Sequence, residues 1–252
     1  MSDSSRIDWL TGPDGTSGAT INPWGWGCWG PGGSAESPRR CSYCFAERMA
    51  QRKTNKCPQC QAFIPHWHPE QLEKPLHWRK PKRVFVQSMG DPFGDWVTAE
   101  QLDRVLEVIA ACPQHMFYML TKAPQNIMQK LYEVTEAWPC RELGGGDYLP
   151  NLWLGASITD ERSNEATADE MACLHAWSRF LSIEPLLGAI SPEYLSWADW
   201  VIVGAQSGRD AAKHQPKREW VEDIVHQCGV NSIPVFVKSS LSYVSNRQQW
   251  PK

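Results

Sequence analysis

Three cysteines are the residues of this chain whose types and spacing best support chemistry. Cys28 ends a glycine- and tryptophan-rich segment, and Cys41 and Cys44 follow it with the spacing C-x-x-C and an aromatic residue between them. Cubane iron–sulfur clusters are held by cysteine thiolates in short-spaced runs. Three thiolates on a four-iron cluster leave one iron open to bind a substrate or cofactor. The pattern therefore predicts a site-differentiated [4Fe–4S] cluster.

The same cysteines allow other interpretations. A structural zinc site needs four closed ligands, so a zinc knuckle would have to borrow a fourth ligand from farther down the chain. Buried cysteines without any metal are the remaining alternative. The sequence between Cys28 and Cys41 is rich in glycine, which lets backbone N–H groups approach sulfur or phosphate closely. We favour the cluster.

A second set of potential metal ligands lies in residues 54–82, a proline-rich segment that we expect to be an insertion. Cys57, Cys60, His66 and His68 follow the pattern C-x2-C-x5-H-x-H, which supplies four ligands of the types that zinc prefers. We predict a second metal site here, structural zinc, with an ordinary surface loop as the alternative. The short H-x-H step argues against both histidines binding one ion.

The elements that must position these residues alternate between strands and helices. Apolar runs predict six or seven strands, at 19–21, 84–86, 116–120, 152–156, 180–183, 200–203 and 234–237. Helical spacing predicts helices at 44–53, 100–111, 125–134, 160–176 and 216–228. Such alternation implies a parallel α/β sheet with right-handed crossovers. A partial or closed (β/α) barrel satisfies it, and so does a doubly wound sheet.

Polar side chains follow each of the predicted strands. In β/α barrels the chemistry is located at the C-terminal ends of the strands. These positions hold Gln87, Ser88, Asp91, Thr121, Lys122, Ser157, Asp160, Ser182, Glu184, Gln206, Ser207, Arg209 and Lys238. Any one of them is more often a cap or loop residue, but a purely structural barrel would not need charged groups at all these positions.

Composition limits the class of protein. The 252 residues suit a single barrel-like domain over 1–252, and 42% hydrophobic residues are enough for a sizeable core. A net charge of −3 gives no global signal for nucleic acid, so any basic patch must be local. Lys74–Arg83 is the most basic stretch and could meet phosphates, although a solvated charge run is the commoner interpretation. No apolar run is long enough to span a membrane. The polar start of the chain and the clustered cysteine pairs predict a protein of the reducing cytoplasm.

Blocks along nearly the whole chain carry a family resemblance. They are Asn22–Trp24, Gly27–Cys28, Cys41–Ala50, Val84–Asp91, Leu120–Lys122, Asn151–Gly155, Phe180–Leu186, Asp199–Gly204 and Val235–Lys238. In these blocks the chain resembles the phage Gp37/Gp68 (DUF5131) family, whose three-cysteine motif is similar to that of the radical SAM enzymes. The chain departs from the radical SAM pattern in one respect. Twelve residues separate Cys28 from Cys41, far more than in most radical SAM proteins.

The resemblance implies a radical SAM-type barrel with a [4Fe–4S] cluster on the three cysteines and S-adenosylmethionine (SAM) as cofactor. By similarity, Ser88 and Asp91 hold the methionine amino group, and Glu184 holds ribose hydroxyls or acts as acid or base. Lys122, Arg209 and Lys238 would bind an anionic group. We assign catalytic roles to Glu184, Asp91 and Lys122, and cofactor-binding roles to Ser88, Asp91, Ser157, Glu184, Gln206 and Ser207.

The activity that the resemblance implies is reductive cleavage of SAM, with the resulting radical abstracting hydrogen from a substrate. A reductant protein would then be a partner, and the phage association makes nucleic acid or a nucleotide the substrate class to consider. Two alternatives belong to other classes. One is a zinc-stabilised nucleic-acid-binding protein without radical chemistry. The other is a barrel hydrolase that uses Asp91 and Glu184 with a metal.

Overall fold

The computed structural model describes residues 5, 7–52, 56–137, 149–174, 177–191, 195–208 and 211–251. Its centre is a sheet of seven parallel strands, which are hydrogen-bonded in the order β1-β2-β3-β4-β5-β6-β7. The strands are Gly18–Ile21 (β1), Arg83–Val86 (β2), Met116–Thr121 (β3), Leu152–Ile158 (β4), Ser178–Ile183 (β5), Trp200–Val203 (β6) and Val235–Val237 (β7). All seven predicted strands are therefore present.

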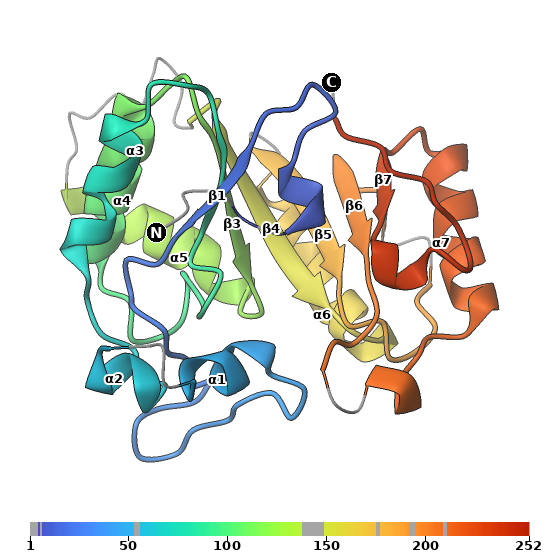
Figure 1. The fold of residues 1–252 in the computed structure, drawn as a ribbon, viewed down its shortest axis with the longest axis horizontal. Helices are drawn as coiled ribbons and strands as arrows, with labels where there is room; N and C mark the ends of the chain where they lie inside the picture. The colour runs from blue at the N-terminus through green and yellow to red at the C-terminus, as the bar shows by residue number, and fades with distance from the viewer. Residues whose placement is uncertain are drawn as a thin grey trace.

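The helices lie between and around these strands (Figure 1). They are Phe45–Ala50 (α1), Pro58–Gln61 (α2), Glu73–His77 (α3), Ala99–Ala111 (α4), Gln125–Ala137 (α5), Glu161–Ala172 (α6) and Arg218–Val230 (α7). Short 3-10 helices are Asp8–Leu10 (η1), Pro69–Gln71 (η2), Ala211–Lys213 (η4) and Ser239–Leu241 (η5). In Figure 1, α3, α4 and α5 lie to the left of the strands, α7 lies to the right beside β7, and α1 and α2 lie below the sheet.

The sheet is a curled half-barrel, which confirms the predicted fold class in its partial form. Strand order follows chain order without a reversal, whereas a doubly wound sheet reverses its order at a switch point. The doubly wound alternative is therefore wrong. The closed barrel is wrong as well, because β1 and β7 are the two edges of the sheet.

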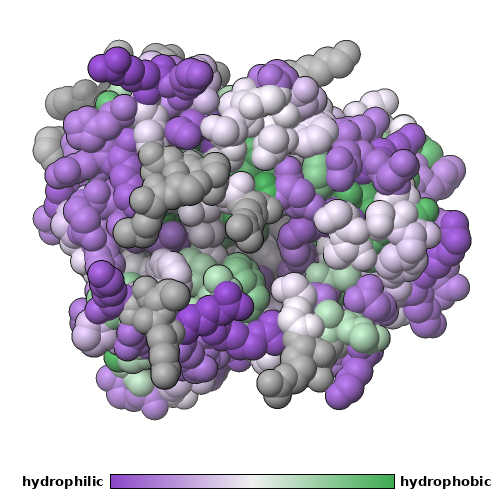
Figure 2. All heavy atoms as spheres, in the orientation of Figure 1, coloured by the Kyte–Doolittle hydropathy of each residue, from purple (hydrophilic) through white to green (hydrophobic). Residues whose placement is uncertain are grey.

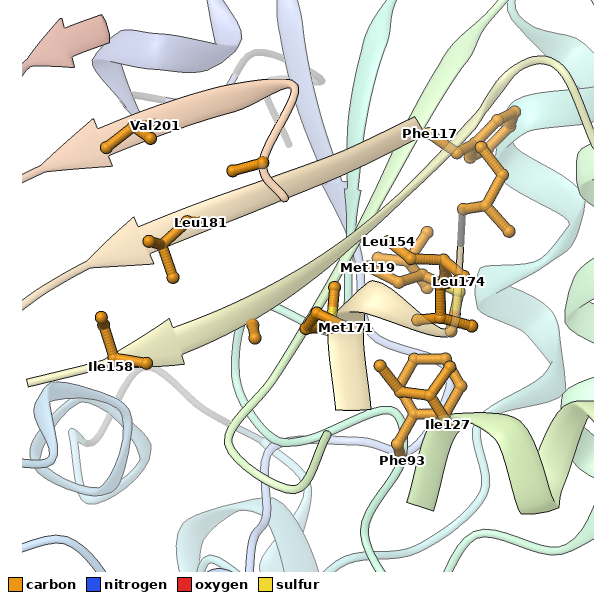
Figure 3. Close-up of a cluster of buried hydrophobic side chains, with 14 of the residues drawn as sticks. Phe93, Phe117, Met119, Ile127, Leu154, Ile158, Met171, Leu174, Leu181 and Val201 are labelled. Carbon is orange, nitrogen blue, oxygen red and sulfur yellow. The ribbon is translucent and has the colours of Figure 1, made fainter. Parts of the chain in front are cut away.

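Alternate strand residues face two different cores, as expected for the period of two of a β-strand. Aliphatic side chains on the outer face pack against the helices. Figure 3 shows Met119, Leu154 and Leu181 from three neighbouring strands on the side of the sheet that Ile127 of α5 and Met171 of α6 cover. This burial on the outer face is the main apolar contribution to the stability of the fold.

Aromatic side chains fill the inner face at the N-terminal ends of the strands. This inner cluster consists of Trp9, Leu10, Phe85, Tyr118, Trp153, Phe180, Trp200, Ile202 and Phe236. The indole ring of Trp9, from η1, lies 5.3 Å from the ring of Phe85 and 5.8 Å from that of Trp200. The half-barrel is thus plugged at one end, which leaves the other end of the inner face free for a site.

Local signals account for most helix boundaries. Thr98 and Gln101 form a capping box at the start of α4, and Asp160 caps α6 through the N–H of Ser163. Helix α1 (Phe45–Ala50) is shorter than the predicted 44–53, and α5 (Gln125–Ala137) is longer than the predicted 125–134. Helix α6 ends at Ala172 rather than at 176. The sequence at 138–150, with three consecutive glycines at 144–146, predicts a loop between α5 and β4, and most of it lies outside the described residues. No helix in the described part of the chain has the length and apolarity to span a bilayer.

Candidate functional site

A cavity of about 470 Å³ opens at the C-terminal ends of the strands. On the face drawn in Figure 2 the surface is hollowed near its centre, over the middle of the sheet. The residues predicted for the site line this cavity together: Cys28, Cys41, Cys44, Ser88, Asp91, Lys122, Ser157, Glu184, Gln206, Ser207 and Lys238. Arg209 lies outside the described residues.

The three cysteines occupy the wall of the cavity next to α1. Burial, with smaller effects of the charges of Asp91 and the other two cysteines, raises the pKa of the Cys28 thiol to about 12. Burial also raises the pKa of the Cys44 thiol, and the N–H of Glu47 at 3.4 Å opposes this shift. Partly buried thiols of this kind become thiolates when they bind a metal.

The three cavity cysteines do not form a compact group of single-ion ligands in the described part of the chain. Among the described residues, the compact group that could hold one ion is formed by Cys57, Cys60, His66 and His68, and not by the three cavity cysteines. The thiolate ligands of a cubane are bound to different irons and need not converge on one point. Backbone N–H groups approach two of the sulfurs, at 3.2 Å from Gly30 to Cys28 and 3.4 Å from Glu47 to Cys44.

The long separation of Cys28 and Cys41 is taken up by a looped-out excursion. The N–H of Arg39 donates to the carbonyl of Trp29 at 2.6 Å, so residues 30–38 leave and return at the same place. Gly30 has a φ of 82°, and a Cβ there would lie 2.0 Å from the carbonyl oxygen of Arg39. If the excursion is skipped, three residues (Trp29, Arg39 and Arg40) separate the cysteines.

Arg40 holds the base of this excursion, a role that the sequence did not indicate. Its guanidinium donates to the carbonyl of Cys28 at 3.2 Å and pairs with Glu47 of α1 at 2.7 Å. It also lies over the rings of Trp29 and Phe63, at 5.3 and 5.4 Å from their centroids. One side chain therefore joins the segment of Cys28 to the helix that follows Cys44.

Gln87 ties the segment before Cys28 to the end of β2. Its buried amide donates to the carbonyl of Gly25 at 2.8 Å and accepts the N–H of Trp24 at 3.1 Å. Asn22 makes a parallel contact by accepting the N–H of Met89 at 2.9 Å. These side chains also were not predicted as organising residues, although both fall in the sequence blocks that carry the family resemblance.

Asp91 is almost fully buried in the cavity wall. Its carboxylate accepts the hydroxyl of Thr121 at 2.6 Å and the N–H groups of Lys122 and Phe93 at 2.9 and 3.0 Å. Burial raises the pKa of the Asp91 carboxyl, and these three hydrogen bonds act in the opposite direction. Asp91 thereby fastens the loop after β2 to the end of β3.

Glu184 and Lys238 form an ion pair across the mouth of the half-barrel. The Lys238 Nζ lies 2.6 Å from the Glu184 Oε1, and both side chains are about one quarter exposed (21% and 28%). The Nζ of Lys122 donates to the Ser157 hydroxyl at 2.9 Å. Charged groups that follow four different strands thus face the same space.

Two further residues complete the rim, and neither was predicted. The ring of Tyr43 lines the cavity 5.8 Å from the Nζ of Lys122, and burial together with the nearby Cys41 raises the pKa of its hydroxyl. Arg48 of α1 donates to the carbonyl of Ser207 at 2.8 Å, which joins α1 to the loop after β6. Such contacts between distant segments have no signature in residue spacing.

The Cys/His group of the 54–82 insertion lies beside the segment that leads to Cys28. The ligand atoms of Cys57, Cys60, His66 and His68 all lie within 4.8 Å of one another. The expectation that the H-x-H step keeps the two histidines from one ion is therefore wrong in this structure, where their ring centroids lie 4.4 Å apart. Desolvation of the Cys57 thiol is outweighed by its hydrogen-bonding contacts with the Cys60 backbone and with the imidazoles of His66 and His68, so its pKa is lowered to about 6.

Comparison with known protein families assigns the chain to one of them. A profile described as a protein of unknown function (DUF5131) matches residues 6–250. The chain belongs to the DUF5131 family. This family assignment carries no activity of its own, and a comparison with curated proteins gave no significant match.

A comparison with solved structures finds three chains similar to this DUF5131 protein, all of them spore photoproduct lyase mutants. A mutant in which a tyrosine is replaced by phenylalanine aligns with a TM-score of 0.54 and 11% identity over 93% of this chain and 80% of the lyase. A double mutant of the same enzyme, with bound AdoMet and dinucleoside spore photoproduct, aligns with a TM-score of 0.45 and 11% identity over 97% of this chain and 64% of the lyase. Because the sequence identities are this low, the first match, with a TM-score of 0.54, shows a shared fold and nothing beyond it.

Proposed function

We propose that this DUF5131 protein is a radical SAM-like enzyme that holds a [4Fe–4S] cluster on Cys28, Cys41 and Cys44 and cleaves SAM reductively. One observation carries the proposal. Three cysteines with an effective three-residue and two-residue spacing line the same cavity as the polar strand ends of a half-barrel. The fold shared with spore photoproduct lyase supports it.

The contacts of the cavity residues separate those suited to bind SAM from one that positions the protein backbone. When bound, the cluster and SAM would supply a carbon-centred radical able to abstract a hydrogen atom from the substrate. Glu184, held by Lys238, is suited to accept hydrogen bonds from ribose hydroxyls, and Lys122 is suited to pair with a carboxylate. Asp91 acts as a positioning residue in this proposal, because its oxygens already accept three hydrogen bonds from the protein.

The floor of the cavity is apolar and suits reactive chemistry. Trp9, Phe85 and Leu120 line the cavity below the polar rim, and the inner aromatic cluster continues beneath them. Such a floor keeps water away from the part of the cavity beneath the charged groups. Ser88, Ser157, Gln206 and Ser207 offer hydrogen-bonding groups around the mouth, where we propose that SAM is oriented.

The test is anaerobic purification followed by iron and sulfide analysis. We expect a brown protein with about four irons per chain and, on reduction with dithionite, formation of 5′-deoxyadenosine from SAM. The variant Cys41→Ala/Cys44→Ala should lose both. The control variant Cys173→Ala, at an exposed cysteine after α6, should keep both.

A colourless protein after cluster reconstitution would overturn this proposal and favour the zinc-stabilised nucleic-acid-binding alternative. The barrel hydrolase is less well supported, since Asp91 accepts three protein hydrogen bonds and Glu184 is paired with Lys238. Our proposal includes a separate reductant protein, a reducing cytoplasm, and a nucleic acid or nucleotide as the first substrate class to assay.

A further inference from the structure

Three sulfur–nitrogen distances in the Cys/His group of the insertion are close to those of a tetrahedral zinc site. The Nε2 of His66 lies 3.2 Å from the sulfur of Cys57 and 3.6 Å from that of Cys60, and the Nε2 of His68 lies 3.6 Å from the sulfur of Cys60. Zinc–sulfur bonds of about 2.3 Å and zinc–nitrogen bonds of about 2.0–2.1 Å give sulfur–nitrogen edges of about 3.6 Å in a tetrahedron. Three of the four sulfur–nitrogen edges are therefore close to those of a mononuclear site, and all four ligand atoms lie within 4.8 Å of one another.

The two histidines are already oriented as metal ligands. The Nδ1 of His66 lies 2.7 Å from the carbonyl oxygen of Ile64, and the Nδ1 of His68 lies 2.6 Å from a carboxylate oxygen of Glu70. Both of these oxygens are acceptors, so each Nδ1 must carry the proton and each Nε2 is left with a free lone pair. Zinc-bound histidines have this arrangement, with the second ring nitrogen held by a carbonyl or carboxylate.

The group is joined directly to the segment before Cys28. The N–H groups of His66 and His68 donate to the carbonyls of Trp24 and Pro23, at 3.3 and 2.6 Å. The N–H of Trp26 donates to the sulfur of Cys60 at 3.3 Å. The segment that delivers Cys28 to the cavity is thus built onto the backbone that carries the two histidines.

Two glycines show how closely the two segments pack. A Cβ on Gly25, whose φ is 64°, would lie 2.6 Å from the Cε1 of His66. A Cβ on Gly27 would lie 2.3 Å from the backbone of Ile64 and Pro65. Phe63, which follows the Cys57–Cys60 pair, forms a small buried core with Ala46, Ala50 and Met89. Cys28 and Cys44 pack against this core.

We propose that Cys57, Cys60, His66 and His68 bind one zinc ion, and that this ion holds the segment carrying Cys28 in place. The zinc is structural: all four ligands come from the protein, and none of them lines the cavity. The metal assignment is independent of the radical chemistry proposed above. A zinc site of this kind stabilises the folded insertion by the free energy of metal binding.

The first experiment is metal analysis of the 252-residue chain, purified anaerobically after expression with zinc. We expect about one zinc per chain in the wild type, in Cys173→Ser and in Cys41→Ala/Cys44→Ala, and loss of zinc in Cys57→Ser/Cys60→Ser. X-ray absorption at the zinc edge should give two sulfur neighbours at about 2.3 Å and two nitrogen neighbours at about 2.0–2.1 Å. This second readout needs no variant, so it holds even if the double variant does not fold.

A wild-type chain without zinc, zinc retained by Cys57→Ser/Cys60→Ser, or iron bound by these four ligands would overturn the assignment. If the cluster proposal fails instead, metal analysis will find zinc but no iron in the wild-type chain. For the coupling, zinc is removed with a chelator and hydrogen exchange is followed in peptides covering residues 22–30. We expect exchange there to accelerate at least about tenfold while α7 is unchanged, and equal exchange with and without zinc would refute the coupling.

Discussion

At the scale of single residues, the cavity separates groups that hold the protein together from groups with capacity left for a ligand. Asp91 and Gln87 are buried, and the polar atoms of both side chains form hydrogen bonds with backbone N–H or carbonyl groups. Glu184, Lys238 and Lys122 are partly exposed, and their recorded partners are other side chains at the rim. Contacts with a bound cofactor should therefore depend most on this second set.

Glu184→Gln tests the second set. The amide can still accept from Lys238, so the free energy of unfolding should change by less than about 1 kcal/mol. The affinity of the cluster-loaded protein for SAM should fall about tenfold, since replacing a charge-assisted hydrogen bond of about 1.5–3 kcal/mol by a neutral one of about 0.5–1.5 kcal/mol loses about 1–1.5 kcal/mol. Anaerobic titration calorimetry measures the affinity, and Glu222→Gln, at an exposed pair with Arg218 on α7, is the control. Unchanged affinity in Glu184→Gln would contradict the assigned role.

Gln87→Leu tests the first set. The substitution leaves the buried N–H of Trp24 and carbonyl of Gly25 without their partner, and each such group costs about 1–3 kcal/mol. We expect the free energy of unfolding in urea to fall by about 2–4 kcal/mol, with reduced iron incorporation. Gln129→Leu, at an exposed side chain of α5, should change stability little. A similar small loss in both variants would mean that Gln87 is not a clamp.

At the scale of elements, the sequence predicts strands far better than it predicts the contacts between loops. All seven strands could be placed because apolar runs such as Val84–Val86 and Trp200–Val203 are buried on both faces of the sheet. The polar residues after them were also found, since their position follows from the parallel topology. Arg40 could not be found in this way, because its partners are set by a loop whose path no local propensity specifies.

The excursion between Cys28 and Cys41 gives a prediction at this scale. Trp29 and Arg39 are already joined by a backbone hydrogen bond of 2.6 Å, so replacing residues 30–38 by a short glycine linker should leave both cysteines in position. We expect iron content within about a factor of two of the wild type. Arg40→Ala, which removes the side chain at the base of the excursion, should lower it much more. Loss of iron in the linker variant would show that the excursion itself builds the site.

The contact between α3 and the starts of β2 and β3 gives a pH dependence. Burial lowers the pKa of His115 from its ordinary value of 6.5, and its ring accepts the N–H of Lys82 and contacts the carbonyl of Pro75. With a lowered pKa in the folded state, the stability is fully present above pH 6.5 and is lost as the pH falls, because the unfolded chain takes up the proton first.

We therefore expect the free energy of unfolding of His115→Gln to depend less steeply on pH than that of the wild type below pH 6.5. The difference in slope can reach about 1.4 kcal/mol per pH unit for one proton. Urea denaturation at a series of pH values between about 5 and 7.5 measures it. His226→Gln, at an exposed position of α7, should keep the wild-type slope, and equal slopes for both variants would refute the assignment.

At the scale of the whole molecule, an open half-barrel has to close its inner face by means other than an eighth strand. The two ends of the described chain do this together. Trp9 of η1 lies among the inner aromatic rings, and the indole N–H of Trp250 donates to the carbonyl of Trp9 at 3.0 Å. The ring of Trp250 also lies 5.0 Å from that of Phe236 on the edge strand β7.

Trp9→Ala tests whether this plug supports the site above it. Removal of a buried tryptophan costs about 3–5 kcal/mol when the cavity cannot collapse, and the sheet that surrounds Trp9 on the inner face limits such collapse. We expect a loss of this size in urea denaturation, together with weaker SAM binding, because Trp9 also lines the floor of the 470 Å³ cavity. Trp220→Ala, at a half-buried tryptophan of α7, should lose less stability and keep SAM binding. If both variants lose less than about 1 kcal/mol, the aromatic plug is not what holds the half-barrel closed.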